Sequence, residues 1–499
     1  MKSIKKQATI LEDKNFSVSI SYPPLNTYRK EKPFLSQNRQ FQWTNTNNVI
    51  YPVIPAYAAT LLQKNNYQVI WDDAIAENLT FRNWLSRLIK NKPNLICIES
   101  KTPVIKYHWK IINQIKTKLP KSTIVLMGDH VTALPKESLF NSKVDYVLTG
   151  GDYDFMLLSL ANYLTKKTKL DSGFYYQKNN NIYNSGKFAL KHHNLNDLPI
   201  INRTLTKWQL YAYNNTNYKH TPGSYIMSAR DCWWGKCTFC SWTTLFPGNS
   251  YRTFSVTHTI KEIENLITNF GVKEVFDDSG TLPVGQWLND FCLELIKRKI
   301  NKKIKIGCNM RFGCLNERQY RLMSQAGFRF LLYGLESSSQ KTLDKINKNS
   351  KTEYVLSDLK LAKKYHLEPH ITIMIGYPWE TKNDIENTLN LSRQLFHQGL
   401  VDSMQATIVI PYPGTPLFNY CKKNNFLKTF DWNKYDMSQS IMKTSLSDIE
   451  LKKYIQRLYI GIITPQFLLN KIKSVKNFSD LKTHVFYTYK YLLKLLDFK

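Results

Sequence analysis

Short apolar stretches alternate with amphipathic stretches along residues 1–165. Apolar runs such as FSVSISYPP, NLICIES and STIVLMGD have the length of strands, while IPAYAATLLQKNNY and HWKIINQIKTKL repeat their apolar residues at helical spacing. Strands that alternate with helices are joined by crossovers, which makes neighbouring strands parallel. The pattern therefore predicts a doubly wound, Rossmann-like α/β domain over residues 1–165, with any ligand bound at the carboxyl ends of its strands.

A second strand–helix series begins near residue 224, after an Asn- and Tyr-rich polar connector over residues 166–223. Six strand–helix repeats predict a partial α/β barrel over residues 224–420, whose active site would lie at the carboxyl ends of the strands. Residues 421–499 are expected to form a helical extension. The six apolar runs are SYIMSAR, EVFDDSG, KIGCNM, FLLYGLES, HITIMIGYP and MQATIVIPYPGTP.

The charge balance widens the range of candidate partners without selecting one. The chain has 69 Lys and Arg against 38 Asp and Glu, a formal net charge of +31, which favours nucleic acid, membrane surfaces or phosphorylated substrates. A biased genome composition is the alternative, because Lys and Asn are abundant throughout. The first residues lack the apolar core of a signal peptide, and no apolar run is long enough to span a bilayer, so a cytoplasmic protein is expected.

The segment SARDCWWGKCTFCSW, residues 228–242, holds three of the eight cysteines directly after the first barrel strand. Thiolates at the mouth of a barrel indicate a metal centre. One interpretation is a structural zinc site of Cys232, Cys237, Cys240 and His220. The other is an iron–sulfur cluster, which fits three cysteines better because a cubane held by three thiolates keeps one iron open to an exogenous ligand. The remaining cysteines are scattered singly, which is typical of reduced thiols in a core.

These cysteines and several later segments resemble the radical S-adenosylmethionine (SAM) superfamily over about residues 224–420. FDDSG is similar to its second-strand motif, QAGFRFLLYGLESSSQKTLDKINK to its AG…GIESGS…L…K segment, and IMIGYPWET to its GlPgET strand. The usual cysteine spacing is C-x3-C-x2-C, whereas four residues separate the first pair here. Longer first spacings, including ones that open with CWWG, occur in the superfamily, so this difference indicates a subgroup.

The resemblance implies that the three cysteines hold a [4Fe–4S] cluster whose open iron binds SAM. An electron from an external flavodoxin- or ferredoxin-type donor would then split SAM into methionine and a 5′-deoxyadenosyl radical. By motif position, Phe239 lies near the adenine, Glu336 and Ser337 lie near the ribose or the methionine part of SAM, and Gly376 belongs to the same cofactor site.

Three charged residues that end barrel strands are further candidates for this site. Asp277 and Asp278 end the second strand, and two adjacent acids there need a cation, amine or hydroxyl partner to offset their desolvation. The alternative is a solvated turn. Arg311 follows the third strand and is a candidate for the carboxylate of SAM, the alternative being an ordinary surface arginine.

The first domain resembles the cobalamin-binding domain that precedes the barrel in a large class of radical SAM proteins. The resemblance rests on IYPVIPAYAATLLQ, GDHVTALPKE and DYVLTGGDYD. No D-x-H-x-x-G occurs in residues 1–165, so no histidine ligand to cobalt is predicted, and His130 is expected to line the pocket or cap a turn. Asp129 in place of glycine and GGDYD in place of GEGE leave open a domain that kept the fold without the corrinoid. The implied corrinoid-site residues are Ser100, Gly128, His130, Gly150 and Gly151.

The number of cysteines limits the reaction. Only Cys97 precedes the barrel and only Cys421 follows it, which excludes the second cluster of methylthiotransferases and auxiliary clusters after the barrel. With cobalamin, the leading prediction is methylation of an unactivated carbon in a small-molecule, lipid or peptide substrate. One alternative is a cobalamin-independent radical SAM enzyme that cyclises, rearranges or modifies RNA. The other is a corrinoid- or nucleic-acid-binding module with a structural metal site.

Residues 451–499 interleave aromatic and leucine residues with many more Lys and Arg than Asp. This composition favours a helical cap over the barrel mouth, whose apolar stripe packs on the protein core. The alternative is a basic amphipathic helix on an anionic membrane, which would make the protein membrane-peripheral and allow it to present a lipid substrate to the site.

Overall fold

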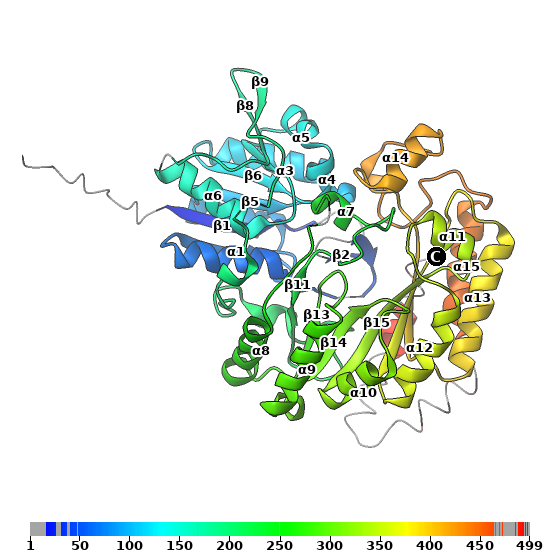
Figure 1. Cartoon of the computed structure of the whole chain (residues 1–499). Coiled ribbons are helices and arrows are strands. Elements are labelled where there is room, and N and C mark those ends of the chain that lie inside the picture. Colours follow the sequence, from blue (N-terminus) through cyan, green and yellow to red (C-terminus); the bar gives the residue numbers. More distant parts are fainter. Residues whose placement is uncertain are drawn as a thin grey trace, which may run out of the picture.

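The structure, a computed structural model, consists of two α/β units. Figure 1 shows the N-terminal unit, blue to cyan, beside a larger unit that runs from green to orange. The structure describes residues 16–25, 31–36, 40–46, 48–166, 168–190, 192–248 and 250–463, and scattered residues between 465 and 497.

The N-terminal unit is built on a mixed sheet of strand order β4-β1-β5-β6-β7-β8-β9. The first five strands in this order are parallel, and β8 and β9 extend the sheet as an antiparallel hairpin within the predicted connector. The parallel strands confirm the predicted Rossmann-like fold class. The strands are β1 (Ser17–Tyr22), β4 (Gln68–Asp73), β5 (Leu95–Glu99), β6 (Thr123–Met127), β7 (Tyr146–Leu148), β8 (Phe174–Lys178) and β9 (Asn181–Asn184).

Helices cover both faces of this sheet. Successive residues of β5 point to opposite faces: Cys97 belongs to one apolar cluster, and Ile96 and Ile98 belong to another. A strand that is apolar on both faces is the signature of a doubly wound sheet. Helices α1 (Val53–Lys64) and α6 (Tyr153–Lys166) pack on the first face, and α2 (Phe81–Asn91) and α3 (Ile105–Lys118) pack on the second. Two short helices, α4 (Asp129–Ala133) and α5 (Pro135–Asn141), follow β6, and a separate hairpin comprises β2 (Lys32–Ser36) and β3 (Gln40–Thr44).

The second unit is an open sheet of six parallel strands in the order β10-β13-β14-β15-β16-β17. All six strands that the hydrophobic pattern predicts are present, and the sheet is a partial barrel because β10 and β17 do not pair. The strands are β10 (Gly223–Ile226), β13 (Glu274–Asp277), β14 (Lys305–Met310), β15 (Phe328–Glu336), β16 (Glu368–Ile375) and β17 (Ser403–Ile408).

Helices between these strands cover the outside of the barrel sheet. Two of them begin at capping boxes, in which Asn316 and Thr381 accept hydrogen bonds from the backbone of Gln319 and Asp384. Such caps satisfy the first free N–H groups of a helix and set where it begins. The helices are α8 (Val256–Phe270), α9 (Gln286–Lys297), α10 (Glu317–Gln325), α11 (Gln340–Lys345), α12 (Glu353–Lys364) and α13 (Lys382–His397).

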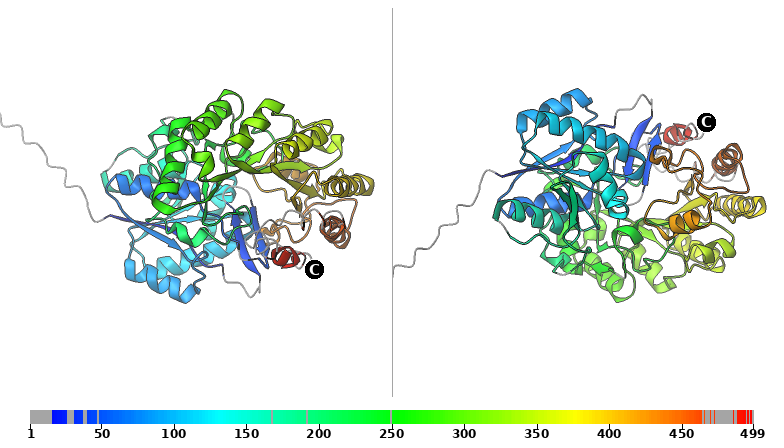
Figure 2. Two further views of the ribbon diagram at one scale, coloured as in Figure 1. Left: turned by 90° about the horizontal axis from the view of Figure 1, so that it is seen from below. Right: turned by 90° about the horizontal axis from the view of Figure 1, so that it is seen from above.

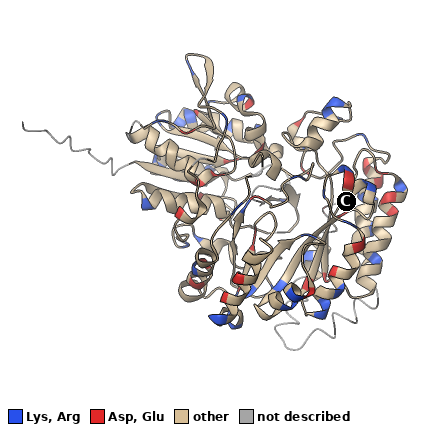
Figure 3. Cartoon of the chain, in the orientation of Figure 1, with Lys and Arg blue, Asp and Glu red and all other residues tan. Residues whose placement is uncertain are grey.

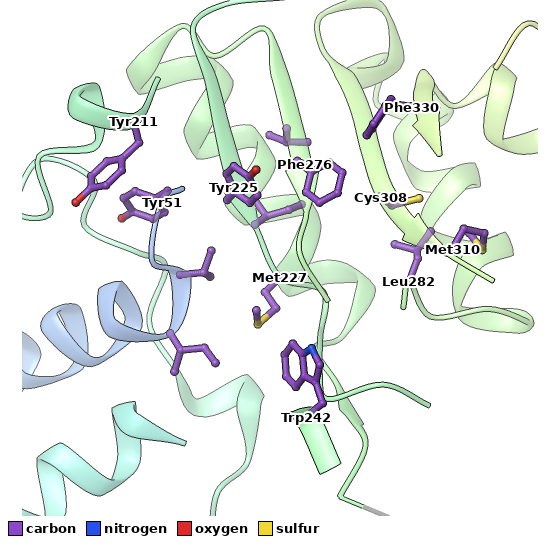
Figure 4. Packing of buried hydrophobic residues seen from close by; sticks show 14 of the residues in the cluster. Tyr51, Tyr211, Tyr225, Met227, Trp242, Phe276, Leu282, Cys308, Met310 and Phe330 are labelled. Carbon is purple, nitrogen blue, oxygen red and sulfur yellow. The ribbon is translucent and has the colours of Figure 1, made fainter. Parts of the chain in front are cut away.

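One apolar core continues from the first unit into the second. Figure 4 shows Tyr51 and Tyr211 beside Tyr225 and Phe276 of the barrel strands, with Trp242 below them. A shared core of this kind opposes free movement of the two units, because separating them would expose apolar surface to water.

The barrel is followed by helices α14 (Pro416–Lys423) and α15 (Asp448–Gly461). Helix α15 buries Leu451, Ile455 and Leu458, while Ile449 and Ile460 on its other side are exposed. The predicted helical packing is therefore present up to residue 461, and most of the predicted amphipathic segment after residue 463 lies outside the described residues. Within the described part of the chain, no helix is long and apolar enough to cross a bilayer.

The end of the chain returns to the first unit. Figure 2 shows the red helical segment near the C-terminus beside the blue β2–β3 hairpin. Asp497 accepts hydrogen bonds from the backbone N–H of Asn45, at 2.8 Å, and from Thr44 Oγ1, at 3.0 Å.

Candidate active site

The three clustered cysteines lie on a loop at the carboxyl edge of the barrel sheet. A short ribbon closes this loop, in which β11 (Ala229–Arg230) pairs with β12 (Arg252–Thr253), and the loop contains helix α7 (Trp242–Leu245). Cys232, Cys237 and Cys240 are free thiols, and each is partly exposed. The predicted position of the thiols at the mouth of the barrel is therefore confirmed.

Two neighbouring strands supply polar groups around the first two cysteines. Thr281 Oγ1 lies 3.2 Å from Cys232 Sγ, and Arg311 Nη1 lies 4.0 Å from Cys237 Sγ. Burial raises the pKa of the Cys237 thiol, whereas the positive charges of Lys348 and Arg311 oppose that rise. Cations beside a buried thiol favour its thiolate form, which is the form that binds metal.

The backbone at Gly280 allows the cysteine loop to approach β13. A Cβ atom at this position would lie 2.7 Å from the Cβ of Cys232, closer than side chains pack. A larger residue at Gly280 would therefore push the first cysteine away from the sheet edge.

The zinc interpretation fails on its fourth ligand. His220 precedes β10 at the opposite, amino edge of the sheet, where its backbone N–H donates to Glu274, the first residue of β13. Among the described residues no three His, Cys, Asp or Glu side chains converge as ligands of a single ion. A cubane cluster does not require such convergence, because each thiolate binds a different iron.

Behind the cysteines, a buried ion pair joins Glu336 to Lys348. Lys348 Nζ lies 2.6 Å from Glu336 Oε1, and both side chains are 7 % exposed. Glu336 ends β15 with a φ of 63°, and a Cβ atom at Gly334 would collide with both partners of the pair. The glycine of the GLES motif therefore leaves the space that this ion pair occupies. Sequence reasoning missed Lys348, although it is the last lysine of the resembling segment.

Arg311 is a buried residue rather than a surface arginine. Its side chain donates to the backbone oxygen of Lys348, and its guanidinium carbon lies 5.3 and 5.0 Å from the ring centres of Trp233 and Trp234. Its Nε has no hydrogen-bond partner within the described part of the chain. Trp233 and Trp234 thus cover the Arg311 guanidinium, whose Nε can still donate a hydrogen bond to a ligand.

The two acids at the end of β13 are both buried, so the solvated-turn interpretation is wrong. Asp277 accepts hydrogen bonds from the backbone N–H of Ser279, at 3.0 Å, and of Ser228, at 3.2 Å. Burial raises the pKa of Asp277, and these hydrogen bonds oppose the rise. Asp277 therefore joins the ends of β10 and β13, and Asp278 beside it is 5 % exposed.

The remaining barrel residues named by motif lie around the next two strands. Ser337 is fully buried with its Oγ 3.4 Å from Glu380 Oε1, and Gly376 donates its N–H to Glu380 Oε2 at 2.9 Å. Burial raises the pKa of Glu380 to about 7. Sequence reasoning did not assign Glu380 a role, although it is the acid of the GYPWET motif. Phe239 is partly buried against the second apolar cluster.

In the first unit, three predicted site residues lie together at the carboxyl edge of the sheet. Ser100 Oγ lies 2.7 Å from His108 Nδ1, and a Cβ atom at Gly128 would collide with the carbonyl oxygen of Ser100. His130 is fully buried, with Nε2 3.1 Å from Glu137 Oε2. The imidazole thus links α4 to α5 just after β6, and its role in lining the pocket or capping a turn stays a prediction.

The other two predicted corrinoid-site residues are covered by aromatic side chains. A Cβ atom at Gly150 would lie 2.6 Å from the ring of Phe188, and one at Gly151 would collide with the ring of Phe246. Phe246 belongs to the barrel unit. Gly151 therefore allows the barrel unit to pack closely on the first unit, and Gly150 leaves space for Phe188 of the connector.

A buried charged group that sequence reasoning missed lies beside Ser100. Lys101 is 1 % exposed, and its Nζ lies 3.2 Å from Glu99 Oε1. Burial lowers the pKa of Lys101, but the carboxylates of Asp129 and Glu99 outweigh burial and the net shift is upward. Within the described residues, Lys101 Nζ and the hydroxyls of Tyr153 and Tyr412 make no hydrogen bond. Buried donors without a hydrogen-bond partner destabilise the fold unless a ligand or a water molecule accepts from them.

The positive charge of the chain is distributed over the molecule. Figure 3 shows Lys and Arg scattered over the outer helices of both units and interspersed with Asp and Glu on the barrel helices. This distribution does not single out a nucleic-acid surface, so a nucleic-acid partner stays a prediction.

Comparisons with known families find a match over most of the barrel. Residues 226–392 match the family model described as the radical SAM superfamily. An uncharacterized methyltransferase of Pyrococcus horikoshii is 27 % identical over 429 residues, which are 84 % of this chain and 90 % of the relative. An anaerobic magnesium-protoporphyrin IX monomethyl ester cyclase of Cereibacter sphaeroides is 22 % identical, over 79 % of this chain and 63 % of the relative.

Solved structures share the two-unit architecture. The radical SAM methyltransferase TsrM from Kitasatospora setae, with cobalamin and a [4Fe–4S] cluster bound, gives a TM-score of 0.65 at 12 % identity and covers 90 % of this chain and 89 % of its own. The cobalamin-dependent radical SAM enzyme OxsB gives a TM-score of 0.67 at 15 % identity, with coverage of 97 % and 72 %. At these identities the likeness establishes the fold.

Proposed function

We propose that this protein, a radical SAM enzyme with a Rossmann-like N-terminal domain, methylates an unactivated carbon of its substrate with the help of cobalamin. One observation carries the radical SAM part: three free cysteines share one loop at the carboxyl edge of a parallel half-barrel, with Arg311 4.0 Å from the second of them. The donor set is that of a cubane cluster with one open iron.

The chain's own residues would bind and orient these cofactors. Cys232, Cys237 and Cys240 would hold the cluster, which would supply the electron for reductive cleavage of SAM, and a bound cobalamin would supply the methyl group. Arg311 and Lys348 would offset the negative charge of three thiolates. Glu336 Oε1 is held by Lys348, and Oε2 accepts a long hydrogen bond of 3.4 Å from Thr372. Oε2 would also accept from a hydroxyl group of SAM, and Arg311 Nε would donate to the carboxylate of SAM.

The proposal of a corrinoid is supported by buried donors in the first unit that have no hydrogen-bond partner among the described residues. Lys101 Nζ and the Tyr153 hydroxyl lie buried at the carboxyl edge of the N-terminal sheet, where doubly wound domains bind ligands. A corrinoid carries amide carbonyls around its ring that would accept hydrogen bonds from such donors. We therefore place the corrinoid beside Ser100, Lys101 and Gly128.

A cobalamin-independent radical SAM enzyme is the second candidate. Phe188 and Phe246 fill the space beside Gly150 and Gly151, which the resemblance to corrinoid domains assigned to the cofactor. If these rings keep their positions, the first unit would serve as a scaffold, and the reaction would be a cyclisation, a rearrangement or an RNA modification without methyl transfer.

The first experiment tests the cofactors. Protein reconstituted anaerobically with iron and sulfide should bind about four irons per chain and, with SAM and a strong reductant, release 5′-deoxyadenosine. Stoichiometric zinc without iron would contradict the radical SAM proposal. Cobalamin added to the reconstituted protein should co-elute in gel filtration; complete separation would favour the cobalamin-independent candidate.

The second experiment addresses the substrate and partners. A deletion strain and its parent, both grown with methyl-deuterated methionine, should differ in a small molecule, lipid or peptide that carries the labelled methyl group only in the parent. Reduced flavodoxin or ferredoxin should replace the chemical reductant. We expect the protein in the cytoplasmic fraction, and salt-sensitive flotation with anionic liposomes would identify a peripheral membrane protein and favour a lipid substrate.

A further inference from the structure

The ribbon that closes the cysteine loop places two arginines directly opposite each other. Arg230 and Arg252 are cross-strand partners in the pairing of β11 with β12, one just before the loop and the other just after it. Like charges at directly opposed positions destabilise a strand pair unless an anion lies between them. The loop therefore needs an acid at its base.

Asp152 of the other unit supplies that acid. Its Oδ1 accepts from Arg230 Nη1 at 3.0 Å and from Arg252 Nη2 at 2.9 Å. Asp154 completes the group, because its two oxygens accept from Arg230 Nη1 at 3.0 Å and from Nη2 at 2.8 Å. Both acids and Arg230 are completely buried, whereas Arg252 is 20 % exposed, so two cations face two anions at the margin of a region that water does not enter.

His193 holds Asp152 from a third direction. Its Nδ1 lies 2.9 Å from Asp152 Oδ2, its ring stacks on Phe155 with 4.7 Å between the ring centres, and its backbone oxygen accepts from Arg252 Nη1 at 2.8 Å. Burial alone would raise the pKa of Asp152, but Arg230, His193 and Arg252 hold it below its usual range. Asp152 is therefore an anion in the folded protein.

We propose that Asp152 and Asp154 are positioning residues for the cysteine loop: from the N-terminal unit they hold both of its ends and so set the spacing of the cluster ligands. These acids belong to the GGDYD segment, whose resemblance to corrinoid domains had suggested a role at the cofactor. The order of the loop is independent of the proposed function, and only the effect on a bound cluster rests on it.

The barrel offers a matched control. Arg203 and Glu262 form another buried ion pair, with Nη2 2.7 Å from Oε1 and both side chains at most 2 % exposed. This pair links the connector to α8 and does not contact the cysteine loop. Asp152→Asn and Glu262→Gln each replace one buried carboxylate by an amide of the same shape, so a general loss of stability should affect both variants alike.

The first measurement uses the protein without metal. Hydrogen–deuterium exchange of residues 231–251 should be about tenfold faster in Asp152→Asn than in the wild type, because the base of the loop opens locally. In Glu262→Gln the loop should exchange at the wild-type rate. Equal protection of the loop in Asp152→Asn and wild type, or equal loss of protection in both variants, would overturn the proposal.

The second measurement uses reconstituted protein and a chelator. Asp152→Asn should lose iron about tenfold faster than Glu262→Gln, which is the usual effect of removing a residue that orients metal ligands. If Asp152→Asn is insoluble, Arg252→Gln is used in its place, and the exchange of the loop and the rate of iron loss are measured in the same way. Arg252 is 20 % exposed, so its replacement should be better tolerated. A wild type that binds no iron would refute the proposed function, and the exchange experiment would still decide the role of Asp152.

Discussion

At the carboxyl edge of the barrel sheet the candidate cofactor-binding groups are three partly exposed thiols, whereas at the edge of the N-terminal sheet the candidate is a fully buried charge, Lys101, paired with Glu99. A thiol is only weakly polar, so it can be partly exposed at little cost and the barrel edge can remain open. The charge of a buried lysine needs an acidic partner whether or not a cofactor is bound, so the N-terminal edge carries its own acids. The two edges therefore differ in how strongly the fold depends on the residues that would bind a cofactor.

The largest effect expected from this difference is at the barrel edge. Cys237→Ala should abolish iron binding on anaerobic reconstitution and with it the formation of 5′-deoxyadenosine, because a cubane cluster cannot be held by two thiolates alone. The unfolding temperature of the metal-free protein should change little. Cys97→Ala is the control, since this thiol lies in the core of β5. Loss of iron in the control, or full iron in Cys237→Ala, would contradict the assignment.

At the N-terminal edge, by contrast, we expect a substitution to lower the stability of the fold and to leave iron binding unchanged. Lys101→Met should lower the free energy of unfolding by about 3–5 kcal/mol, because it leaves Glu99 and Asp129 buried without their cation. It should also weaken cobalamin retention in gel filtration while leaving the iron content unchanged. Lys106→Met removes an exposed pair with Asp431 and should cost less than about 1 kcal/mol. Similar costs for both variants, measured by urea unfolding, would remove the distinction between the edges.

The barrel edge has one buried acid whose stability contribution depends on pH. Burial raises the pKa of Glu380 to about 7 from an ordinary 4.5, so the folded state binds its proton more tightly than the unfolded state. This group therefore favours the fold below pH 4.5, and about 3 kcal/mol is lost as the pH rises through 7. Glu380→Gln should remove that part of the pH slope. An identical slope between pH 4.5 and 8 in both proteins would show that Glu380 does not titrate there.

The smallest expected effect concerns Trp234, whose ring packs over Arg311. Trp234→Phe keeps a ring beside the guanidinium but removes the hydrogen bond from Trp234 Nε1 to the backbone oxygen of Asn347, which is 2.7 Å long. We expect a cost of about 1 kcal/mol in unfolding free energy and no loss of iron. Iron loss in this variant would show that the indole N–H, and not the ring, fixes the loop.

Most of the architecture follows from the sequence. The strand–helix alternation predicts both parallel sheets, and the six barrel strands occur where the apolar runs place them. Local patterns predict these elements well because burial on both faces requires nearly continuous apolar strands. The hairpin β8–β9 was not predicted, because β9 is short and mostly exposed and the aromatic residues of β8 stand in an otherwise polar connector. The pairing of β8 with β7 is a tertiary contact.

Part of the candidate site is also readable from the chain. The cysteine spacing identifies the cluster ligands, and the motif after β15 identifies Glu336. Lys348 and Glu380 carry no local sign of burial, and a lysine or glutamate in a polar segment is ordinarily exposed. Only the packing of the loop after α11 against β15 places Lys348 beside Glu336.

The sequence by itself determined the two sheets, the three cysteines and the resemblance to radical SAM proteins, because each depends on residues that lie close together in the chain. The tertiary structure alone decided which edge His220 occupies, which acids neutralise Arg230 and Arg252, and which rings cover Gly150 and Gly151. These contacts join segments far apart in the chain. Spacing carries no record of such pairs, since they form only when the folded chain brings distant segments into contact.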